Sequence, residues 1–490
     1  MPDSHRPNIL FVLIDDLGYA DLGCYGSIFY ETPHLDRLAG RGLRFTDSYA
    51  ACPVCSPTRA SLLTGKYPAT VGITNWIGGN PWGKLMGVPF FDRLPEGETT
   101  VAQALRDGGY HAWHVGKWHL GPESRHPNRV GFENNVGGCH WGAPHEGYFA
   151  PWGIETLPDS LDGTYLTDRL TDEAVALIER GAQADRPWFL HLAHYAVHTP
   201  LQAPPELVKK YEEKARALGL DPEGEIELGD PFPCLHKKDM RIARRTVQSH
   251  PVYAAMIENL DTNLGRTFAA LQRTGQLDNT IVIFTSDNGG LSSAEGSPTC
   301  NAPLQEGKGW MYDGGVREPW IAAWPGVIAP GTTTDATVTS PDLFPTLLDV
   351  AGLAPRPEQH IDGRSFAPVL RGEPFDRGPI FWHYPHYSNQ GGTPACSVRD
   401  GRWKLIEFFE DQRLELYDLQ EDLGERHNLA PTRPDRTAEL HRTLVAWRES
   451  VAARIPEPNP DYQAMLAGEC PRPDGRGVFP TDDTLIPGDD

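Results

Sequence analysis

The chain has 490 residues, 39% of them hydrophobic and 22% charged, and it carries 66 acidic against 44 basic side chains. That length predicts two or three domains, or one large domain with a smaller one, and the apolar fraction is sufficient for a sizeable core. The composition excludes a disordered, collagenous or coiled-coil chain. The formal charge of −22 argues against nucleic acid and anionic membranes as partners, because both favour basic surfaces.

The sequence shows no signal for a membrane or for export. It contains no run of about 18 apolar residues, so no membrane-spanning helix is predicted. The first residues, Met1–Arg6, lead straight into an apolar run without the basic start, long apolar stretch and cleavage site of a signal peptide. Eight cysteines in so long a chain do not form a disulfide scaffold. For a chain that starts at Met1 we therefore expect a cytoplasmic address.

Four apolar runs favour β-strands buried on both faces, which is typical of parallel sheets covered by helices. Helical patterns lie between these runs. The alternation predicts an α/β fold with a large central, mostly parallel β-sheet sandwiched by helices. The predicted strands are Asn8–Ile14, Tyr110–Val115, Pro187–Leu192 and Ile281–Thr285, and the predicted helices are Thr99–Asp107, Thr164–Arg180 and Pro251–Thr274.

The pattern changes after residue 375. Turn signals between short aromatic and aliphatic runs predict antiparallel hairpins over Ser397–Tyr417, and an amphipathic helix follows over Arg436–Ala453. We expect the Pro-, Asp- and Gly-rich tail beyond it to wrap the surface. These features predict a large α/β domain over 1–375 and a C-terminal α+β subdomain with the tail over 376–490.

Two acidic pairs follow predicted strands of the sheet, Asp15-Asp16 after the first and Asp287-Asn288 after the last. Ligand sites of open α/β sheets gather beyond the carboxyl ends of the strands. Such residues also serve as turn residues or helix caps, so either pair alone leaves both interpretations open. These side chains offer only oxygen ligands, which suit a hard cation such as Ca²⁺ or Mg²⁺.

The segment 51–65 reads Ala-Cys-Pro-Val-Cys-Ser-Pro-Thr-Arg-Ala-Ser-Leu-Leu-Thr-Gly. Pro57 suits the first position of a helix and Gly65 the position just past its end. Cys55 would then lie at the helix N-terminus, where free N–H groups and the helix dipole favour an anion. Arg59, one turn further on, would aim its guanidinium toward the same point. The segment therefore predicts an anion cradle beside a cysteine.

Three interpretations of Cys55 remain open at this point. It is a buried and inert thiol, or it forms a redox or zinc-binding C-x-x-C pair with Cys52. No second C-x-x-C is present, which weakens the zinc interpretation. The third interpretation rests on the whole string Cys-Ser-Pro-Thr-Arg-x-x-Leu-Leu-Thr-Gly. It resembles the signature of type I sulfatases, in which the cysteine is oxidised after synthesis to Cα-formylglycine.

The resemblance extends over nearly the whole chain, which is similar to type I sulfatases of the alkaline-phosphatase-like superfamily and to bacterial aryl- and carbohydrate sulfatases among them. Thr58 stands where many members have serine. Five further motifs carry the resemblance: Pro7–Gly18, Gly116–Gly121, Ala196–Pro200, Ser286–Gly290 and Glu306–Pro319. It implies a divalent cation, most often Ca²⁺, held by Asp15, Asp16, Cys55, Asp287 and Asn288. It implies catalytic roles for Cys55, Arg59, Lys117, His119, His198 and Lys308.

The resemblance also implies a reaction, the hydrolysis of sulfate monoesters to an alcohol and inorganic sulfate. The nucleophile would be the hydrated aldehyde at position 55, made by a formylglycine-generating maturation enzyme. Lys308 and His198 would assist the departing alcohol, and His119 would take the proton whose loss releases sulfate. Arg59 and Lys117 would offset the sulfate charge.

The substrate is less closely defined, and we expect a small aryl sulfate or sulfated sugar. Two stretches rich in His, Trp and Tyr, 137–142 and 381–392, are candidates for sugar contacts, with core and loop packing as the alternative. Their candidate substrate-binding residues are His140, His383 and His386. Alternative functions are a phosphonate monoester or phosphodiester hydrolase of the same superfamily, a thiol redox or metal-binding protein using Cys52 and Cys55, and a catalytically inactive binding module. The oligomeric state stays open.

Overall fold

An eight-stranded sheet forms the centre of the protein, in the strand order β11-β2-β10-β9-β1-β6-β4-β5. The computed structural model describes residues 6–79, 82–158 and 160–469. Only β10 runs antiparallel to its two neighbours, so the predicted α/β class with a mostly parallel sheet is confirmed. The strands are β1 Asn8–Ile14, β2 Leu43–Phe45, β4 His111–Gly116, β5 Asn134–Val136, β6 Trp188–Ala193, β9 Thr280–Ser286, β10 Trp320–Ala323 and β11 Thr332–Thr334.

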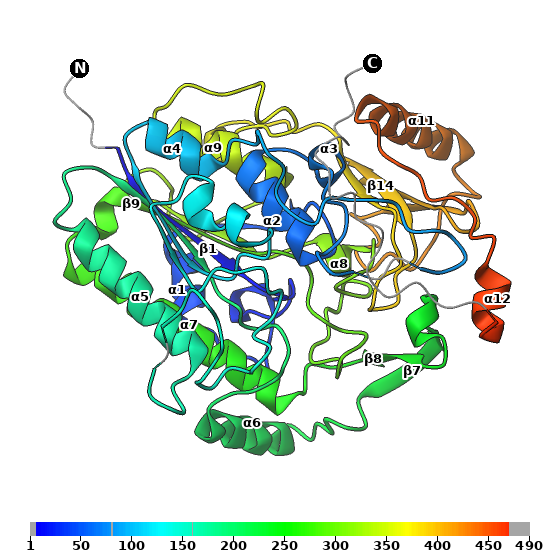
Figure 1. Ribbon diagram of the computed structural model, residues 1–490, viewed down its shortest axis with the longest axis horizontal. Coiled ribbons are helices and arrows are strands. Elements are labelled where there is room, and N and C mark those ends of the chain that lie inside the picture. Colours follow the sequence, from blue (N-terminus) through cyan, green and yellow to red (C-terminus); the bar gives the residue numbers. More distant parts are fainter. Residues whose placement is uncertain (1–5, 80–81, 159, 470–490) are drawn as a thin grey trace.

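Helices cover both faces of this sheet, as Figure 1 shows. Every residue of β1 is buried, and successive side chains enter two different cores because strand side chains alternate between faces. Leu10 and Val12 join the cluster packed by α1, α5 and α7, whereas Ile9 and Phe11 join that of α2, α4 and α9. The helices are α1 Pro33–Arg41, α5 Leu166–Gly181, α6 Pro205–Ala217 and α7 Pro251–Arg273 on one face, and α2 Cys55–Thr64, α3 Pro68–Val71, α4 Val101–Asp107, α9 Leu343–Val350 and α10 Ala367–Leu370 on the other.

The predicted strands and helices are present with small shifts at their ends. The strand expected at Tyr110–Val115 is His111–Gly116, and that expected at Ile281–Thr285 extends by one residue at each end. The helix expected from Thr99 begins at Val101, because the Thr100 hydroxyl accepts a hydrogen bond from the backbone of Gln103 and caps the helix. Among the described residues, no helix has the length and hydrophobicity needed to traverse a bilayer.

A second sheet, antiparallel and four-stranded, begins at Ile380 and has the order β13-β14-β15-β16. It contains the hairpins predicted over Ser397–Tyr417, and the predicted helix, α11, packs against it. The division at residue 375 stays a prediction. Part of the predicted tail, 470–490, lies outside the described residues. The elements are β13 Ile380–Tyr384, β14 Ala395–Asp400, β15 Trp403–Phe408, β16 Leu414–Asp418, α11 Pro434–Ser450 and α12 Tyr462–Ala467.

A buried ion cluster joins the four-stranded sheet to the segment around Asp313. The Lys404 ammonium on β15 lies 2.7 Å from Asp313 and 2.9 Å from Glu425, and all three side chains are fully enclosed. Tyr49 donates a hydrogen bond to the same Asp313 over 2.9 Å. The small sheet thus fixes the segment that follows Lys308.

The remaining strands are β3 Ser48–Tyr49, β7 Ile226–Pro231, β8 Arg241–Arg245 and β12 Val338–Thr339, and the remaining α-helix is α8 Asp313–Val316.

Candidate active site and metal centre

Four neighbouring parallel strands, β9, β1, β6 and β4, deliver polar side chains to one edge of the sheet. The register pairs Ile14 with Ser286, so Asp15 and Asp287 follow side by side, and Asp287 donates its backbone N–H to the Ile14 carbonyl. Because the carboxyl ends of parallel strands share an edge, segments distant in sequence form one cluster there. The side chains are Asp15 and Asp16 after β1, Asp287 and Asn288 after β9, Lys117 and His119 after β4, and His198 after β6.

Helix α2 brings Cys55 and Arg59 to this edge. The helix begins at Cys55 rather than at Pro57, two residues earlier than the sequence predicts. Proline is tolerated at the third position because the first N–H groups of a helix lack intrahelical partners in any case. Gly65 ends the helix as expected, with φ 72° and its N–H on the Ser61 carbonyl. All ten residues of α2 are buried, so the thiol is enclosed by protein.

The Arg59 guanidinium links the two acidic pairs to the loop after β4. Its Nε donates to Oδ2 of Asp287 over 2.8 Å, and its Nη1 donates to the Lys117 carbonyl over 3.1 Å. The Lys117 ammonium in turn lies 2.6 Å from Asp15. These groups are buried, so their charges interact with little solvent screening. Two cations are thereby held beside the position where an anion would meet Cys55.

The acidic cluster has the donor set of a hard-cation site. Ligand atoms of Asp15, Cys55 and Asp287 lie within 4.8 Å of one another, as do those of Asp15, Asp16 and His198. Oδ1 of Asp15 and Oδ1 of Asn288 are buried without a hydrogen-bond partner. Burial raises the pKa of Asp15 well above its usual value, and repulsion from Asp287 adds to this effect. The residues therefore fit a divalent cation, which would satisfy these oxygens and offset their charge.

His119 faces the thiol of Cys55, with Nδ1 3.4 Å from Sγ. Its Nε2 lies 3.1 Å from the Ile77 carbonyl, and because a carbonyl only accepts, Nε2 carries the ring proton. Burial holds the pKa of His119 well below its usual value, and the nearby Lys117 adds to the effect. The imidazole is therefore neutral, with Nδ1 as an acceptor directed at position 55.

Lys308 and His198 form a second proton-carrying pair across the site. The Lys308 ammonium lies 2.7 Å from Asp16 and 3.0 Å from Nε2 of His198, whose Nδ1 lies 2.8 Å from the Thr199 carbonyl. Burial lowers the pKa of His198 to about 3, and Lys308 reinforces it. Burial opposes the charge on Lys308, but Asp16 outweighs it and raises the pKa of the ammonium. The proton of this pair therefore resides on Lys308.

The three candidate substrate-binding histidines lie in different surroundings. His140 is exposed, in the loop that follows β5. His386 is fully buried, with Nε2 2.8 Å from the Thr74 hydroxyl and its ring edge-on to Phe90. His383 is also buried, with Nε2 on the Arg454 carbonyl. The predicted contact of His383 and His386 with the sulfate ester gains no support, because the His386 ring is packed inside the protein and His383 lines a cavity that contains none of the residues around Cys55.

The loop over residues 138–148 contacts both candidate catalytic histidines, His119 and His198, which the sequence did not reveal. A Cβ at Gly142 would lie 2.5 Å from the His119 ring, so the loop packs directly on that imidazole. At its other end, the Tyr148 hydroxyl lies 2.8 Å from the His198 carbonyl. Between these contacts, Trp141 and His145 stack with ring centroids 4.7 Å apart. Only a conspicuous density of aromatic and glycine residues marked this loop in the sequence.

The comparisons with known proteins agree with this architecture. A family model described as Sulfatase matches residues 7–353, and one described as N-sulphoglucosamine sulphohydrolase, C-terminal, matches 306–450. A sulfatase of Formosa agariphila is 32% identical over 91% of this chain and 89% of that protein. Human arylsulfatase A is 31% identical over 90% of this chain and 87% of that protein. The crystal structure of Ps i-CgsB in complex with k-i-k-neocarrahexaose superimposes with a TM-score of 0.71 at 26% identity, covering 95% of this chain and 98% of that one.

Fold and site together define a hydrolase of the alkaline-phosphatase-like superfamily. The chain belongs to the sulfatase family, and its activity is the hydrolysis of sulfate esters. The thiol-redox alternative has little support from the site. Cys52 and Cys55 are both unpaired, and burial raises the pKa of each thiol, which disfavours the reactive thiolate.

Proposed function

We propose that the enzyme works with Cα-formylglycine at position 55, formed from Cys55, and with a bound Ca²⁺. The observation that carries this proposal is the placement of position 55 between the neutral His119 imidazole and the cluster of Asp15 and Asp287. When hydrated, a formylglycine there supplies one hydroxyl oxygen to attack sulfur and a second hydroxyl whose deprotonation releases sulfate and restores the aldehyde.

The residues around position 55 transfer the protons and stabilise the charge in this reaction. His119 accepts a proton at Nδ1, which faces position 55 and is free of the Ile77 hydrogen bond made by Nε2. Lys308 donates its proton to the departing alcohol oxygen, and His198 lies 3.0 Å away to exchange that proton afterwards. Lys117 and Arg59 stabilise the charge that grows on the sulfuryl oxygens, and their buried ion pairs hold both groups in position before the reaction.

The cation would be held by the carboxylates of Asp15, Asp16 and Asp287, by Oδ1 of Asn288 and by the side chain at position 55. When bound, it would supply Lewis acidity to the site. Ca²⁺ suits this set better than Mg²⁺, because Ca²⁺ tolerates irregular oxygen cages and Mg²⁺ requires near-octahedral geometry.

We further propose a small sulfated sugar as substrate, recognised in part by His140. The loop 138–148 supports this proposal, because it contacts His119 and His198 and presents stacked aromatic rings beside an exposed imidazole. Aromatic rings stack on sugar faces and imidazoles bond to hydroxyls. The similar Ps i-CgsB structure contains an oligosaccharide, which favours the sugar over an aryl sulfate.

The seven described cysteines are free thiols, which agrees with a cytoplasmic address.

Two measurements on one preparation test the proposal. Peptide mass spectrometry of active enzyme should show the aldehyde, or its hydrate, at position 55, and only unmodified cysteine in fully active enzyme would refute it. The same preparation should then be assayed with sulfated monosaccharides, aryl sulfates, aryl phosphonates and phosphodiesters. We expect the highest kcat/KM for a sulfated monosaccharide. A higher value for the phosphonate or the diester would favour the phosphonate monoester or phosphodiester hydrolase instead.

A further inference from the structure

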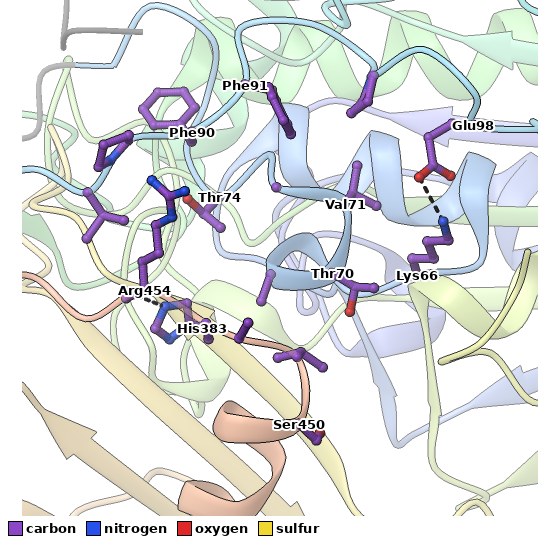
Figure 2. A pocket seen from close by; sticks show the side chains of 18 of the residues that line it. Lys66, Thr70, Val71, Thr74, Phe90, Phe91, Glu98, His383, Ser450 and Arg454 are labelled. Carbon is purple, nitrogen blue, oxygen red and sulfur yellow. Dashed lines mark hydrogen bonds and ion pairs between the residues drawn. The ribbon is translucent and has the colours of Figure 1, made fainter. Parts of the chain in front are cut away.

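A cavity of about 330 Å³, separate from the site around Cys55, lies between α3, the segment 88–98 and the residues that follow α11. Figure 2 shows it with His383 on one side and Phe90 and Phe91 on another. None of the residues that line it belongs to the cluster around Cys55. The cavity has the volume of a small-ligand site.

The walls of the cavity are largely apolar, with Val71, Phe90 and Phe91 among them. At one end, Lys66 and Glu98 pair over 2.7 Å, so their charges are already matched. A ligand that enters therefore meets flat aromatic and aliphatic surface, and this surface favours a ring over a flexible chain because fewer rotatable bonds are fixed on binding.

The His383 ring supplies an unused hydrogen-bond acceptor at the cavity. Its side chain is 3% exposed, and Nε2 lies 2.9 Å from the Arg454 carbonyl, so Nε2 carries the proton. Nδ1 is buried without a partner. Burial lowers the pKa of this imidazole to about 4, which keeps the ring neutral and Nδ1 available as an acceptor at neutral pH. A buried acceptor without a partner is costly, and a ligand hydroxyl or N–H would satisfy it once a small shift of the ring opens Nδ1 to the cavity.

Arg454 supplies a cation on the same side of the cavity. Its guanidinium makes no ion pair within the described ranges 6–79, 82–158 and 160–469, although its carbonyl accepts a hydrogen bond from His383. Figure 2 shows the side chain rising from beside His383 toward Thr74 and Phe90. An unpaired guanidinium presents a fork of donors that matches a carboxylate.

We propose that this cavity is a second, non-catalytic ligand site that binds a small aromatic acid carrying a hydroxyl group. The acid group pairs with Arg454, the hydroxyl donates to Nδ1 of His383, and the ring packs against Phe90 and Phe91. The site is independent of the sulfate ester chemistry at position 55.

Calorimetric titration of the full-length enzyme with 4-hydroxybenzoate tests this site. Benzoate lacks the hydroxyl and 4-hydroxybenzyl alcohol lacks the carboxylate, and each should bind about tenfold more weakly, the size expected for one lost hydrogen bond to a buried or charged group. Arg454→Gln should remove the preference for the carboxylate, and His383→Phe the preference for the hydroxyl. Arg433→Gln is the matched control, an exposed arginine outside the cavity that should leave binding unchanged.

Ala69→Trp gives an independent check, because the indole would fill the cavity and abolish binding even if the His383 variant fails to fold. Sulfatase turnover should be unchanged in the Arg454 variant. Three results would overturn the proposal: no saturable binding of 4-hydroxybenzoate, equal affinity in Arg454→Gln and wild type, or competitive inhibition of turnover with an inhibition constant equal to Kd, which would place the ligand at position 55. The first two leave the sulfatase mechanism untouched.

Discussion

Gly142 lies directly against the imidazole of His119, so closely that a Cβ at this position would come within 2.5 Å of Cε1. The backbone of the same loop also holds the backbone of His119, whose N–H donates to the Cys139 carbonyl over 3.0 Å. His119, the proposed base, is therefore held from two sides, by the Ile77 carbonyl at Nε2 and by Gly142 at the ring edge.

Gly142→Ala should reduce kcat/KM by about 10- to 100-fold, because the added methyl forces the His119 ring away from position 55 and small misplacements of catalytic groups are costly. Thermal unfolding should change little. Gly40→Ala is the control, since no atom lies within 4 Å of a Cβ at Gly40. Equal activity of the two variants would show that the loop does not position His119.

Cys55→Ala should abolish turnover while the thermal midpoint and circular dichroism stay close to those of wild type. Cys52→Ser separates the formylglycine mechanism from a C-x-x-C redox pair, because only the redox pair needs both sulfurs. We expect the Cys52 variant to keep its activity per folded molecule, with some loss of stability from the hydroxyl at this buried position. Parallel loss of activity in both variants would favour the redox pair.

Lys308→Met should slow the hydrolysis of sulfate esters, and the rate loss should increase with the basicity of the leaving alcohol. A sugar alkoxide needs a proton as it departs, whereas 4-nitrophenolate does not, so the rate loss should be about 10²- to 10⁴-fold for sugar sulfates and much smaller for 4-nitrophenyl sulfate. A series of aryl sulfates with different leaving-group pKa values measures this slope. An equal loss across the series would assign Lys308 a role in sulfate binding instead.

Removal of divalent cations should inactivate the enzyme and lower its thermal midpoint, because the carboxylates of Asp15, Asp16 and Asp287 then repel one another. A ligand that binds only the folded state stabilises it by RT ln(1 + [L]/Kd). We expect Ca²⁺ to restore both activity and midpoint at lower concentration than Mg²⁺. The chelator presaturated with Ca²⁺ is the control, and activity that survives exhaustive chelation would contradict the site.

We expect His194 to make the stability of the protein dependent on pH. The ring is fully buried, neither nitrogen has a partner, and burial lowers its pKa to about 3. Between this value and the unfolded value of about 6.5, the unfolded chain binds a proton that the folded chain does not. The stability is therefore complete above about pH 6.5 and falls as the pH drops, by roughly 2 kcal/mol between pH 6.5 and 5 from this one group.

His194→Phe should remove that contribution. Denaturant unfolding of wild type and variant at pH 7 and pH 5 gives a difference of differences, in which any constant packing penalty cancels. We expect the variant to lose less stability on acidification than wild type. An identical loss in both proteins would show that His194 does not carry this pH dependence.

The sequence predicted the sheet and the position of the acidic pairs at its carboxyl edge, because both depend on local patterns. A run such as Asn8–Ile14 can be buried on both faces only inside a covered sheet, and the acidic residues after it necessarily fall at the strand's carboxyl end. The helix start at Cys55 was two residues off, because Pro57 is also compatible with the third helical position.

Contacts between segments that are distant in the chain could not be predicted from the sequence. His386 is buried because Thr74 and Phe90, some three hundred residues earlier in the chain, close over it, and no pattern within 381–392 encodes that packing. The contact of Gly142 with His119 could not be predicted either, because the number of residues between them does not determine the conformation of the loop that joins them. Local periodicity fixes which residues form strands, whereas the order in which strands and loops meet decides which side chains stay exposed.

The burial of all ten residues of α2 determines when position 55 can be modified. An enzyme that oxidises Cys55 needs the thiol and its flanking backbone in its own active site, and the folded chain offers neither. If Cys55 is oxidised as proposed, we therefore expect this maturation to be completed on the extended polypeptide, during or soon after synthesis. Under the proposed mechanism, a molecule that folds first keeps its thiol, so we expect the active fraction of a preparation to depend on the relative rates of oxidation and folding.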